Sequence, residues 1–181
     1  LSISEKMRNQ IRGLNQAVNN SEDGISLIQT AEGNMNEMHS ILQRMGELAT
    51  KAANDVNETE DRTTIKAEID QLNSELAGIA SKAKFNNKSL SDFSGYLQVG
   101  ANSGENMKIS VKVAIEVANI TVDTHGNASK TMSAVTAAIK SVSEQRSQLG
   151  AVQNRLEYTV NNLQNYSENL QSAESRIRDT D

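Results

Sequence analysis

The chain offers few residues that could carry out acid–base or nucleophilic chemistry. It has two histidines, His39 and His125, and no cysteine. A catalytic nucleophile needs a base and an orienting group converging on it, and neither histidine stands in such a pattern. Carboxylate metal enzymes built on helical bundles use Glu-x-x-His pairs, whereas Glu37 and His39 have the wrong spacing. The sequence therefore predicts no enzyme, with no catalytic, cofactor-binding or metal-binding residue.

An acidic cluster and a glycine-rich loop have two readings each. The cluster Asp55, Glu58, Glu60 and Asp61 lacks the glycine and the ligand spacing of a calcium loop. We favour a solvated turn between two helices, with negative charge near the positive start of the second helix. Residues 100–104 lack the Lys-Ser/Thr and the helix that follow a phosphate loop, so we expect a hairpin turn there.

One set of side chains could instead form a contact surface. Arg44 and Leu48 are four residues apart and share one face of a helix. If a second helix folds back along the first, Glu68 comes to the same side. The plain alternative is a solvated face with one core leucine. The full set comprises Gln43, Arg44, Leu48, Ile65, Glu68 and Gln71.

Three segments carry apolar residues at the three- and four-residue spacing of helices, and they must position these side chains. They run over about 2–54, 58–84 and 129–181, and the absence of proline permits such lengths. Asn57 and Glu60 have the spacing of a capping box, and Asn86 or Asn87 suits a left-handed exit. Two long stripes of equal length must cover each other, since neither can bury its face alone.

Residues 85–128 follow a different pattern. Tyr96–Val99 and Met107–Val111 alternate with period two and predict the strands of a hairpin. Residues 112–122 are either a third strand or an extended crossover. The predicted fold is mainly α: an elongated antiparallel bundle of two long helices and one shorter helix, with a small β-hairpin region. We expect a single domain over 1–181, with the hairpin and linker at about 85–128.

Composition excludes several classes of partner. The net charge is −5 without a basic patch, so we expect no nucleic acid. No run approaches the roughly 18 apolar residues of a membrane span, and no signal peptide opens the chain. The chain begins at Leu1, which suggests a trimmed fragment.

Methionines and glycines within the helices are the remaining features. We interpret the methionine stripe as core filling, with an adaptable partner surface as the alternative. Glycine in a helix costs roughly 0.5–1 kcal/mol relative to alanine. We expect close approach of a neighbouring segment or subunit at Gly24 and Gly150, and tolerated drift at Gly46. The stripe consists of Met7, Met35, Met38 and Met45.

Several segments, in order, resemble bacterial flagellin. Ser21-Glu22-Asp23-Gly24-Ile25-Ser26-Leu27-Ile28-Gln29-Thr30-Ala31-Glu32-Gly33 is similar to a flagellin signature, as are residues 42–49 (LQRMGELA) and 66–72 (KAEIDQL). Residues 98–102 (QVGAN) resemble the flagellin hairpin, residues 149–156 (LGAVQNRL) the carboxy-terminal signature, and residues 175–179 (SRIRD) its continuation. The resemblance covers nearly all of the chain except about 112–127.

The resemblance implies a structural subunit of the extracellular flagellar filament, secreted by flagellar export without a signal peptide. The implied partners are other flagellin subunits, the flagellar export machinery with its chaperone, and the host Toll-like flagellin receptor. The alternatives are a flagellar hook–filament junction protein, which should match residues 42–49 less well, and a soluble adaptor.

The resemblance also gives the contact surface a function. The positions matching Gln43, Arg44, Leu48, Ile65, Glu68 and Gln71 bind the receptor in flagellins, and the same face makes filament contacts. Gly46 departs from the family pattern, because a second arginine is usual there. The terminal segments that line the filament core and the large outer domains are absent, so we expect an isolated core fragment that does not polymerise by itself.

Overall fold

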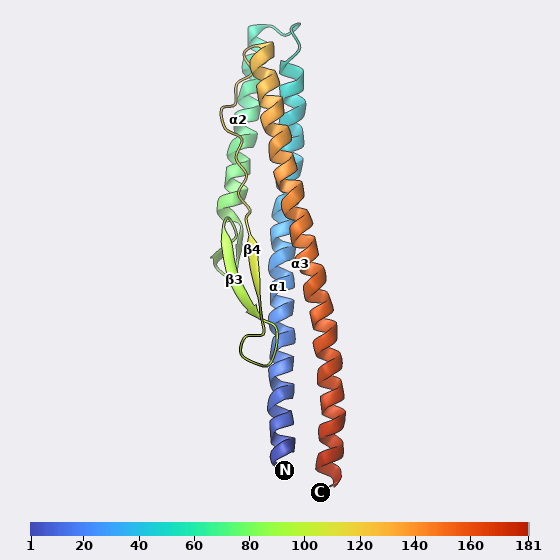
Figure 1. The fold of residues 1–181 in the computed structure, drawn as a ribbon. Coiled ribbons are helices and arrows are strands. Elements are labelled where there is room, and N and C mark those ends of the chain that lie inside the picture. Colours follow the sequence, from blue (N-terminus) through green and yellow to red (C-terminus); the bar gives the residue numbers. More distant parts are fainter. Residues whose placement is uncertain (181) are drawn as a thin grey trace. The chain divides into compact units, whose positions relative to one another are not determined.

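The structure is a computed structural model, and it describes residues 1–180. Three helices dominate it, as predicted, with two small antiparallel strand pairs (Figure 1). In chain order the elements are α1 (Ser2–Ala52), α2 (Thr59–Lys82), β1 (Lys84–Phe85), β2 (Lys88–Ser89), β3 (Phe93–Gln98), β4 (Asn106–Val111) and α3 (His125–Thr180).

The helix ends differ slightly from the prediction. The Asn57 side chain donates to the carbonyl oxygens of Lys51 and Asn54, so it closes α1 and does not cap α2. The capping interaction lies one residue later, where the Glu58 N–H donates to the Asp61 carboxylate at 2.9 Å. α2 therefore starts at Thr59, and the predicted Asn57–Glu60 box is wrong.

The third helix begins at His125 and not at 129, because Thr124 caps it. The Asn127 N–H donates to the Thr124 hydroxyl at 3.0 Å, the usual way in which a threonine satisfies a free first-turn donor. His125, which falls within the predicted linker at about 85–128, is thus the first residue of α3. The last predicted residue of this helix, 181, lies outside the described residues.

The chain forms two compact units, which we describe separately. The α2 unit comprises Thr30–Phe93 and Val111–Gln148, and the hairpin unit comprises Leu1–Gln29, Ser94–Ser110 and Leu149–Asp181. Both α1 and α3 contribute residues to each unit.

The α2 unit has a closed apolar core. The side chains of α1 in this unit face both α2 and α3, and three predicted core methionines are among them. Val135 of α3 lies 3.5 Å from the position that a Cβ on Gly46 would occupy, which places these two helices in contact. The most completely buried side chains here are Met35, Met38, Leu42, Met45, Ile69, Leu76, Leu90, Val113 and Val122.

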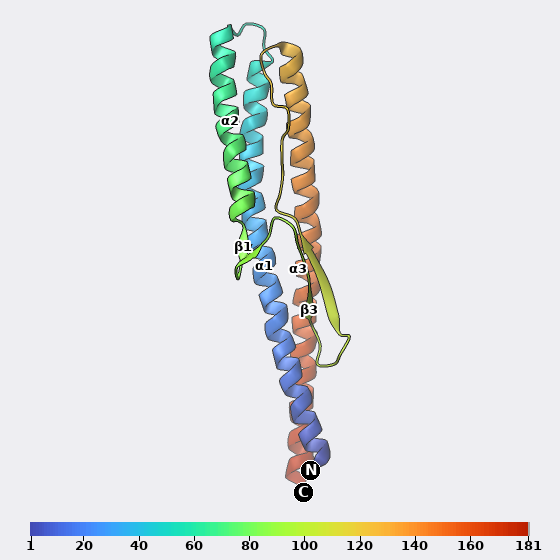
Figure 2. The same cartoon turned by 90° about the vertical axis from the view of Figure 1, so that its left-hand side faces the viewer.

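Residues 112–122 form the extended crossover and not a third strand (Figure 2). Val113, Ile115 and Val117 are buried, while Lys112 and Glu116 are exposed, so the period-two pattern is real. Within residues 1–180, one backbone-to-backbone hydrogen bond, from the Val113 N–H to the Leu90 carbonyl at 2.8 Å, joins this segment to the residue that follows β2. Alternation alone predicted the conformation correctly but could not predict the absence of a pairing strand.

A two-residue turn separates β1 from β2. Asn86 and Asn87 both have positive φ, 50° and 64°, which is the geometry of the primed turns that join tight hairpins. The asparagines predicted at the helix exit therefore shape this hairpin. β3 and β4 pair as the second hairpin, with the predicted loop at residues 100–104 between them.

The described part of the hairpin unit contains the first part of α1, the last part of α3 and the β3–β4 hairpin, but no third helix. Ser4 contacts Glu174 and Asn15 contacts Ser167, so α1 and α3 run antiparallel here. The predicted stripe is less well covered than in the α2 unit, and Ile3 and Tyr166 are exposed. Its half-buried apolar residues are Met7, Ile11, Val152, Val160, Leu163, Leu170 and Ile177.

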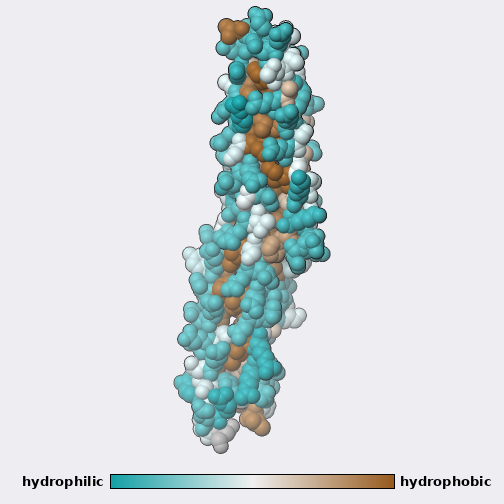
Figure 3. All heavy atoms as spheres, turned by 180° about the vertical axis from the view of Figure 1, so that it is seen from behind, coloured by the Kyte–Doolittle hydropathy of each residue, from teal (hydrophilic) through white to brown (hydrophobic). Residues whose placement is uncertain are grey.

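The visible surface in Figure 3 is mainly hydrophilic, and hydrophobic atoms appear in narrow strips between rows of polar ones. Within residues 1–180, no helix combines the length and the apolar character needed to cross a membrane.

Candidate functional site

The predicted contact residues lie on α1 and α2 within the α2 unit, and we call them the α1–α2 patch. Its centre is Arg44, whose guanidinium donates to the Glu68 carboxylate at 3.0 and 3.2 Å. This pair joins the two helices, as the sequence predicted when it placed both residues on one side. A second carboxylate, Glu47, accepts from Arg44 at 3.3 Å.

The two carboxylates stabilise the charged form of Arg44. The hydrogen bond to Glu68 raises the pKa of Arg44, the hydrogen bond to Glu47 adds to it, and the side chain stays half exposed. An arginine restrained by two carboxylates keeps a fixed direction. Its side chain would therefore lose little conformational entropy on contact with another molecule. Glu47 was not among the predicted residues, although its three-residue spacing from Arg44 could have indicated it.

Two members of the patch are not surface residues. Leu48 and Ile65 are only 3% and 4% exposed. They pack between α1 and α2 and line the floor of a cavity of about 240 Å³. The rim of this cavity is charged and polar, with Arg44, Glu47, Lys51, Asp61, Thr64 and Glu68.

The remaining members lie outside that cavity. Gln43 and Gln71 are exposed, and neither lines it. The structure thus brings Arg44, Glu68, Leu48 and Ile65 together at one depression, with the two glutamines beside it.

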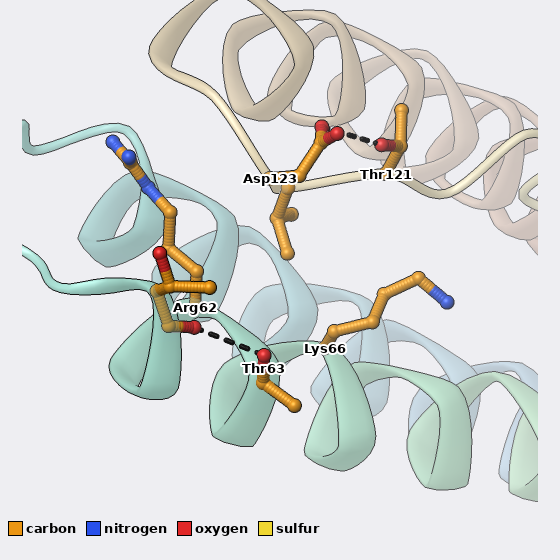
Figure 4. Close-up of a pocket in the computed structure, with 7 residues that line it drawn as sticks. Arg62, Thr63, Lys66, Thr121 and Asp123 are labelled. Atoms are coloured by element: carbon orange, nitrogen blue, oxygen red, sulfur yellow. Dashed lines mark hydrogen bonds between the residues drawn. The ribbon is translucent and has the colours of Figure 1, made fainter.

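A second cavity of similar size lies between the start of α2 and the end of the crossover (Figure 4). Its charged groups are already paired: Arg62 with Asp55 at 3.1 Å and Lys66 with Asp70 at 2.7 Å. Hydrogen bonds from Asn127 and Thr121 lower the pKa of Asp123. These groups therefore serve the fold.

The acidic cluster has the structural role that we favoured. Asp55 pairs with Arg62, and Asp61 satisfies the first backbone donor at the start of α2. Arg62 also donates to the Ala52 carbonyl at 3.0 Å, so the cluster ties the end of α1 to α2. Among residues 1–180, no three His, Asp or Glu side chains are arranged to hold a metal ion.

The two histidines occupy different environments. The ring Nδ1 of His125 lies 2.7 Å from the Ala53 carbonyl oxygen and links the start of α3 to the end of α1. The Nδ1 of His39 is buried and has no hydrogen-bonding partner in the described part of the chain.

The glycine prediction holds at one of its two positions. A Cβ on Gly24 would lie 2.3 Å from Leu97 Cδ1 and 3.1 Å from Leu156 Cδ1, so the hairpin and α3 both approach α1 closely there. Apart from its own helix backbone, nothing in residues 1–180 lies within 4 Å of the Cβ position of Gly150, so a close approach there stays a prediction about another subunit. A similar approach at Gly13 was not predicted: Ala101 of the hairpin loop packs there, and a Cβ on Gly13 would lie 2.9 Å from the Ala101 Cβ.

Two family descriptions match the chain. Residues 1–97 match the bacterial flagellin N-terminal helical region, and residues 132–181 match the bacterial flagellin C-terminal helical region. The unmatched middle, residues 98–131, contains the hairpin loop, β4, the crossover and the first residues of α3.

Full-length relatives agree with this assignment. The chain is 50% identical to a flagellin of Halalkalibacterium halodurans over 192 aligned residues, covering all of this chain and 70% of the relative. It is 41% identical to flagellin FlaB1 of Treponema pallidum, covering 99% of this chain and 71% of that protein. It is also 41% identical to a flagellin of Bacillus subtilis, covering all of this chain and 73% of the relative.

Solved structures share the fold. The crystal structure of Bacillus cereus flagellin superimposes with a TM-score of 0.71 at 27% identity, covering 80% of this chain and 88% of that one. A chain from Vibrio parahaemolyticus described as a flagellar hook-associated protein reaches 0.82, covering 96% and 95%, but its 10% identity shows a common fold alone.

The long helices, joined by polar contacts, define the chain as a helical-bundle protein. The chain belongs to the bacterial flagellin family. Proteins of this family build the extracellular flagellar filament, so a structural role in the flagellum follows from membership.

Proposed function

We propose that this chain is the core of a filament subunit that packs against other copies of itself. Family membership across nearly the whole chain carries this proposal. Repeated head-to-tail contacts that do not close into a ring generate an open filament, with no reaction performed.

The test is reconstitution of the filament. Both ends of the chain are extended with the corresponding terminal segments of the Halalkalibacterium halodurans flagellin, and the product is examined by negative-stain electron microscopy. We expect filaments under conditions that polymerise ordinary flagellin, and none from residues 1–181 alone. Persistent monomers of the extended chain would contradict the proposal, and short caps on pre-formed hooks would favour the hook–filament junction alternative.

We propose further that the two units act as one core domain. The continuity of α1 and α3 through both units supports this proposal. One coincident unfolding transition by circular dichroism and by tyrosine fluorescence is expected.

We also propose that the chain leaves the cell through the flagellar export machinery with a chaperone. The test is secretion of the extended chain from export-competent cells and its retention in export-deficient cells.

We propose that the α1–α2 patch is recognised by the host Toll-like flagellin receptor. The supporting observation is the ordered, half-exposed Arg44 above a small depression floored by Leu48 and Ile65. Arginine is among the residues most often dominant at protein interfaces. The two buried members act by fixing the spacing of the helices, while Gln43 and Gln71 offer neutral hydrogen-bonding groups beside the cation.

A receptor-reporter dose–response curve tests this proposal. Arg44→Ala should weaken the response on the order of tenfold or more, as expected for an interface hot spot. The matched control is Arg12→Ala, which removes an exposed arginine of the same helix in the hairpin unit. Gly46→Arg, which restores the residue usual in the family, should strengthen the response. An unchanged curve for Arg44→Ala would remove the patch from consideration.

A further inference from the structure

A cavity in the hairpin unit is lined by three segments that are far apart in the sequence. Its volume is about 280 Å³, close to the lower limit of roughly 300 Å³ for small-molecule sites, so it can hold about one sugar-sized ring. α1, the loop of the β3–β4 hairpin and α3 each contribute residues to its wall. These are Gln10, Leu14, Ala101, Asn102, Glu105, Asn162, Leu163 and Tyr166.

The hairpin loop is rigid where it forms this wall. The Gln98 side-chain amide donates to the Gly100 carbonyl at 3.1 Å and to the Asn102 carbonyl at 2.7 Å. The Asn102 N–H donates to Glu105 Oε1 at 2.8 Å. Because Gly13 lets Ala101 rest directly on α1, the loop is also anchored to the helix. The wall therefore exists before any ligand arrives, which lowers the entropic cost of binding.

The polar groups of the cavity are not used by the fold. The side-chain amides of Gln10, Asn102 and Asn162 make no hydrogen bond to another group within residues 1–180, and the same holds for the Tyr166 hydroxyl. This separates the cavity from the one in Figure 4, where Arg62 is paired with Asp55 and with the Ala52 carbonyl, and Lys66 is paired with Asp70.

The chemistry of these groups selects a ligand. An amide offers both donors and an acceptor, so it can serve adjacent hydroxyl groups, which are themselves donors and acceptors. Glu105 keeps one carboxylate oxygen free to accept a strong hydrogen bond from a hydroxyl. Tyr166, 52% exposed, presents a ring against which an apolar C–H face can rest, and Leu14 and Leu163 supply apolar contact.

The charge of the lining residues further restricts the class of ligand. Glu105 is the sole charged residue of the lining, and no lysine or arginine contributes to it. An anionic ligand would therefore meet a carboxylate without a compensating cation. A ligand with many hydroxyls, one apolar face and no negative charge fits all of these features.

We propose that this cavity is a binding site for a neutral saccharide, with Tyr166 as the ring platform and Asn102, Asn162 and Glu105 as the hydroxyl-binding groups. This activity is additional to filament formation and does not depend on it.

Saturation-transfer NMR with the 181-residue chain tests the proposal, using lactose and chitobiose as neutral probes and 3′-sialyllactose as the anionic comparison. We expect transfer to at least one neutral sugar and several-fold weaker transfer to sialyllactose. A titration followed by amide chemical shifts should place the changes at residues 100–105 and 162–166.

Tyr166→Ala should weaken the binding of the neutral sugar at least tenfold. Tyr158→Ala is the matched control, because it removes another exposed tyrosine of α3, 71% exposed, that does not line the cavity. Asn162→Ala provides a second variant at an exposed position, where loss of folding is not expected. The proposal is overturned if neither neutral sugar binds, if Tyr158→Ala weakens binding as much as Tyr166→Ala, or if sialyllactose binds as tightly as the neutral sugar that binds.

Discussion

The two units use parts of the same two helices but are stabilised differently. In the α2 unit, α2 and the crossover cover the α1 and α3 stripes, and side chains such as Leu42 and Val142 are wholly buried. In the hairpin unit a two-stranded hairpin is the additional layer, and the apolar residues of α3 from 160 onward remain half exposed.

Polar contacts in the hairpin unit partly replace this missing coverage. Glu174 is buried and accepts hydrogen bonds from Ser4 at 2.7 Å and from Arg8 at 3.2 Å. Ser167 donates to Asn15 at 3.0 Å. Two amphipathic helices can shield only one side of each other, and the comparison shows that directional hydrogen bonds then fix the register that packing fixes elsewhere.

The largest difference should appear when a stripe leucine is shortened in each unit. Leu42→Ala removes a fully buried side chain and should lower the free energy of unfolding by about 3 kcal/mol. Leu170→Ala should cost about 1 kcal/mol, because part of that side chain is already in water. Urea denaturation followed by circular dichroism measures both, and equal losses would contradict the proposed difference in coverage.

Two glycine replacements in α1 should have smaller effects on stability, one destabilising and one stabilising. Gly24→Ala places a methyl group against Leu97 and Leu156 and should destabilise the hairpin unit by about 1–2 kcal/mol. The methyl group of Gly33→Ala in the α2 unit would meet no other part of residues 1–180 within 4 Å, so this change should stabilise by roughly 0.5–1 kcal/mol through helix propensity. Denaturation curves give the signs, and hydrogen exchange should localise the first effect to the β3–β4 hairpin. A stabilising Gly24→Ala would show that the close approach is not needed.

The smallest predicted effect is an acid sensitivity of the hairpin unit. The Ser4 hydroxyl, and then the charge of Arg178 and the contact with Arg8, lower the pKa of Glu174. A carboxyl whose pKa is lower in the folded chain stabilises the fold at neutral pH. That contribution is lost as the pH falls below the ordinary value of about 4.3 and through the lower folded value.

Glu174→Gln should therefore flatten the dependence of the unfolding midpoint on pH in the acidic range. Glu168→Gln, an exposed glutamate of the same helix, is the control and should leave the profile unchanged. If the two variants show the same profile, the buried carboxylate contributes nothing to the acid response.

Sequence periodicity predicted the three helices and the β3–β4 hairpin because burial repeats every 3.6 or every 2 residues along the chain. It could not predict which part of a stripe has a third layer above it. Ile3 and Tyr166 follow the helical spacing of the apolar stripes, yet they are exposed because coverage depends on segments far away in the sequence. The same limit applies to the crossover. Its alternating pattern predicted an extended segment, but no local pattern could show that it lacks a pairing strand.

For the candidate site, residue spacing and the folding back of α2 predicted the Arg44–Glu68 pair. The burial of Leu48 agrees with the alternative of a face with one core leucine. The depression that Leu48 and Ile65 line could not be read from the sequence, because its depth depends on how closely the two helices pack. The approach of Ala101 to Gly13 depends on where a hairpin loop meets a helix, and no local pattern records that distance.

The crossover also makes the chain a good carrier for foreign sequences. Ala118 and Asn119 are exposed, Asn119 already has a turn-like φ of 57°, and no hydrogen bond to the backbone of either residue is formed within residues 1–180. A peptide or a small domain spliced in here would interrupt no helix and no strand pair, and lengthening a loop costs little, about 0.6 kcal/mol for each doubling. Each copy in a polymer would then display its cargo at a regular spacing.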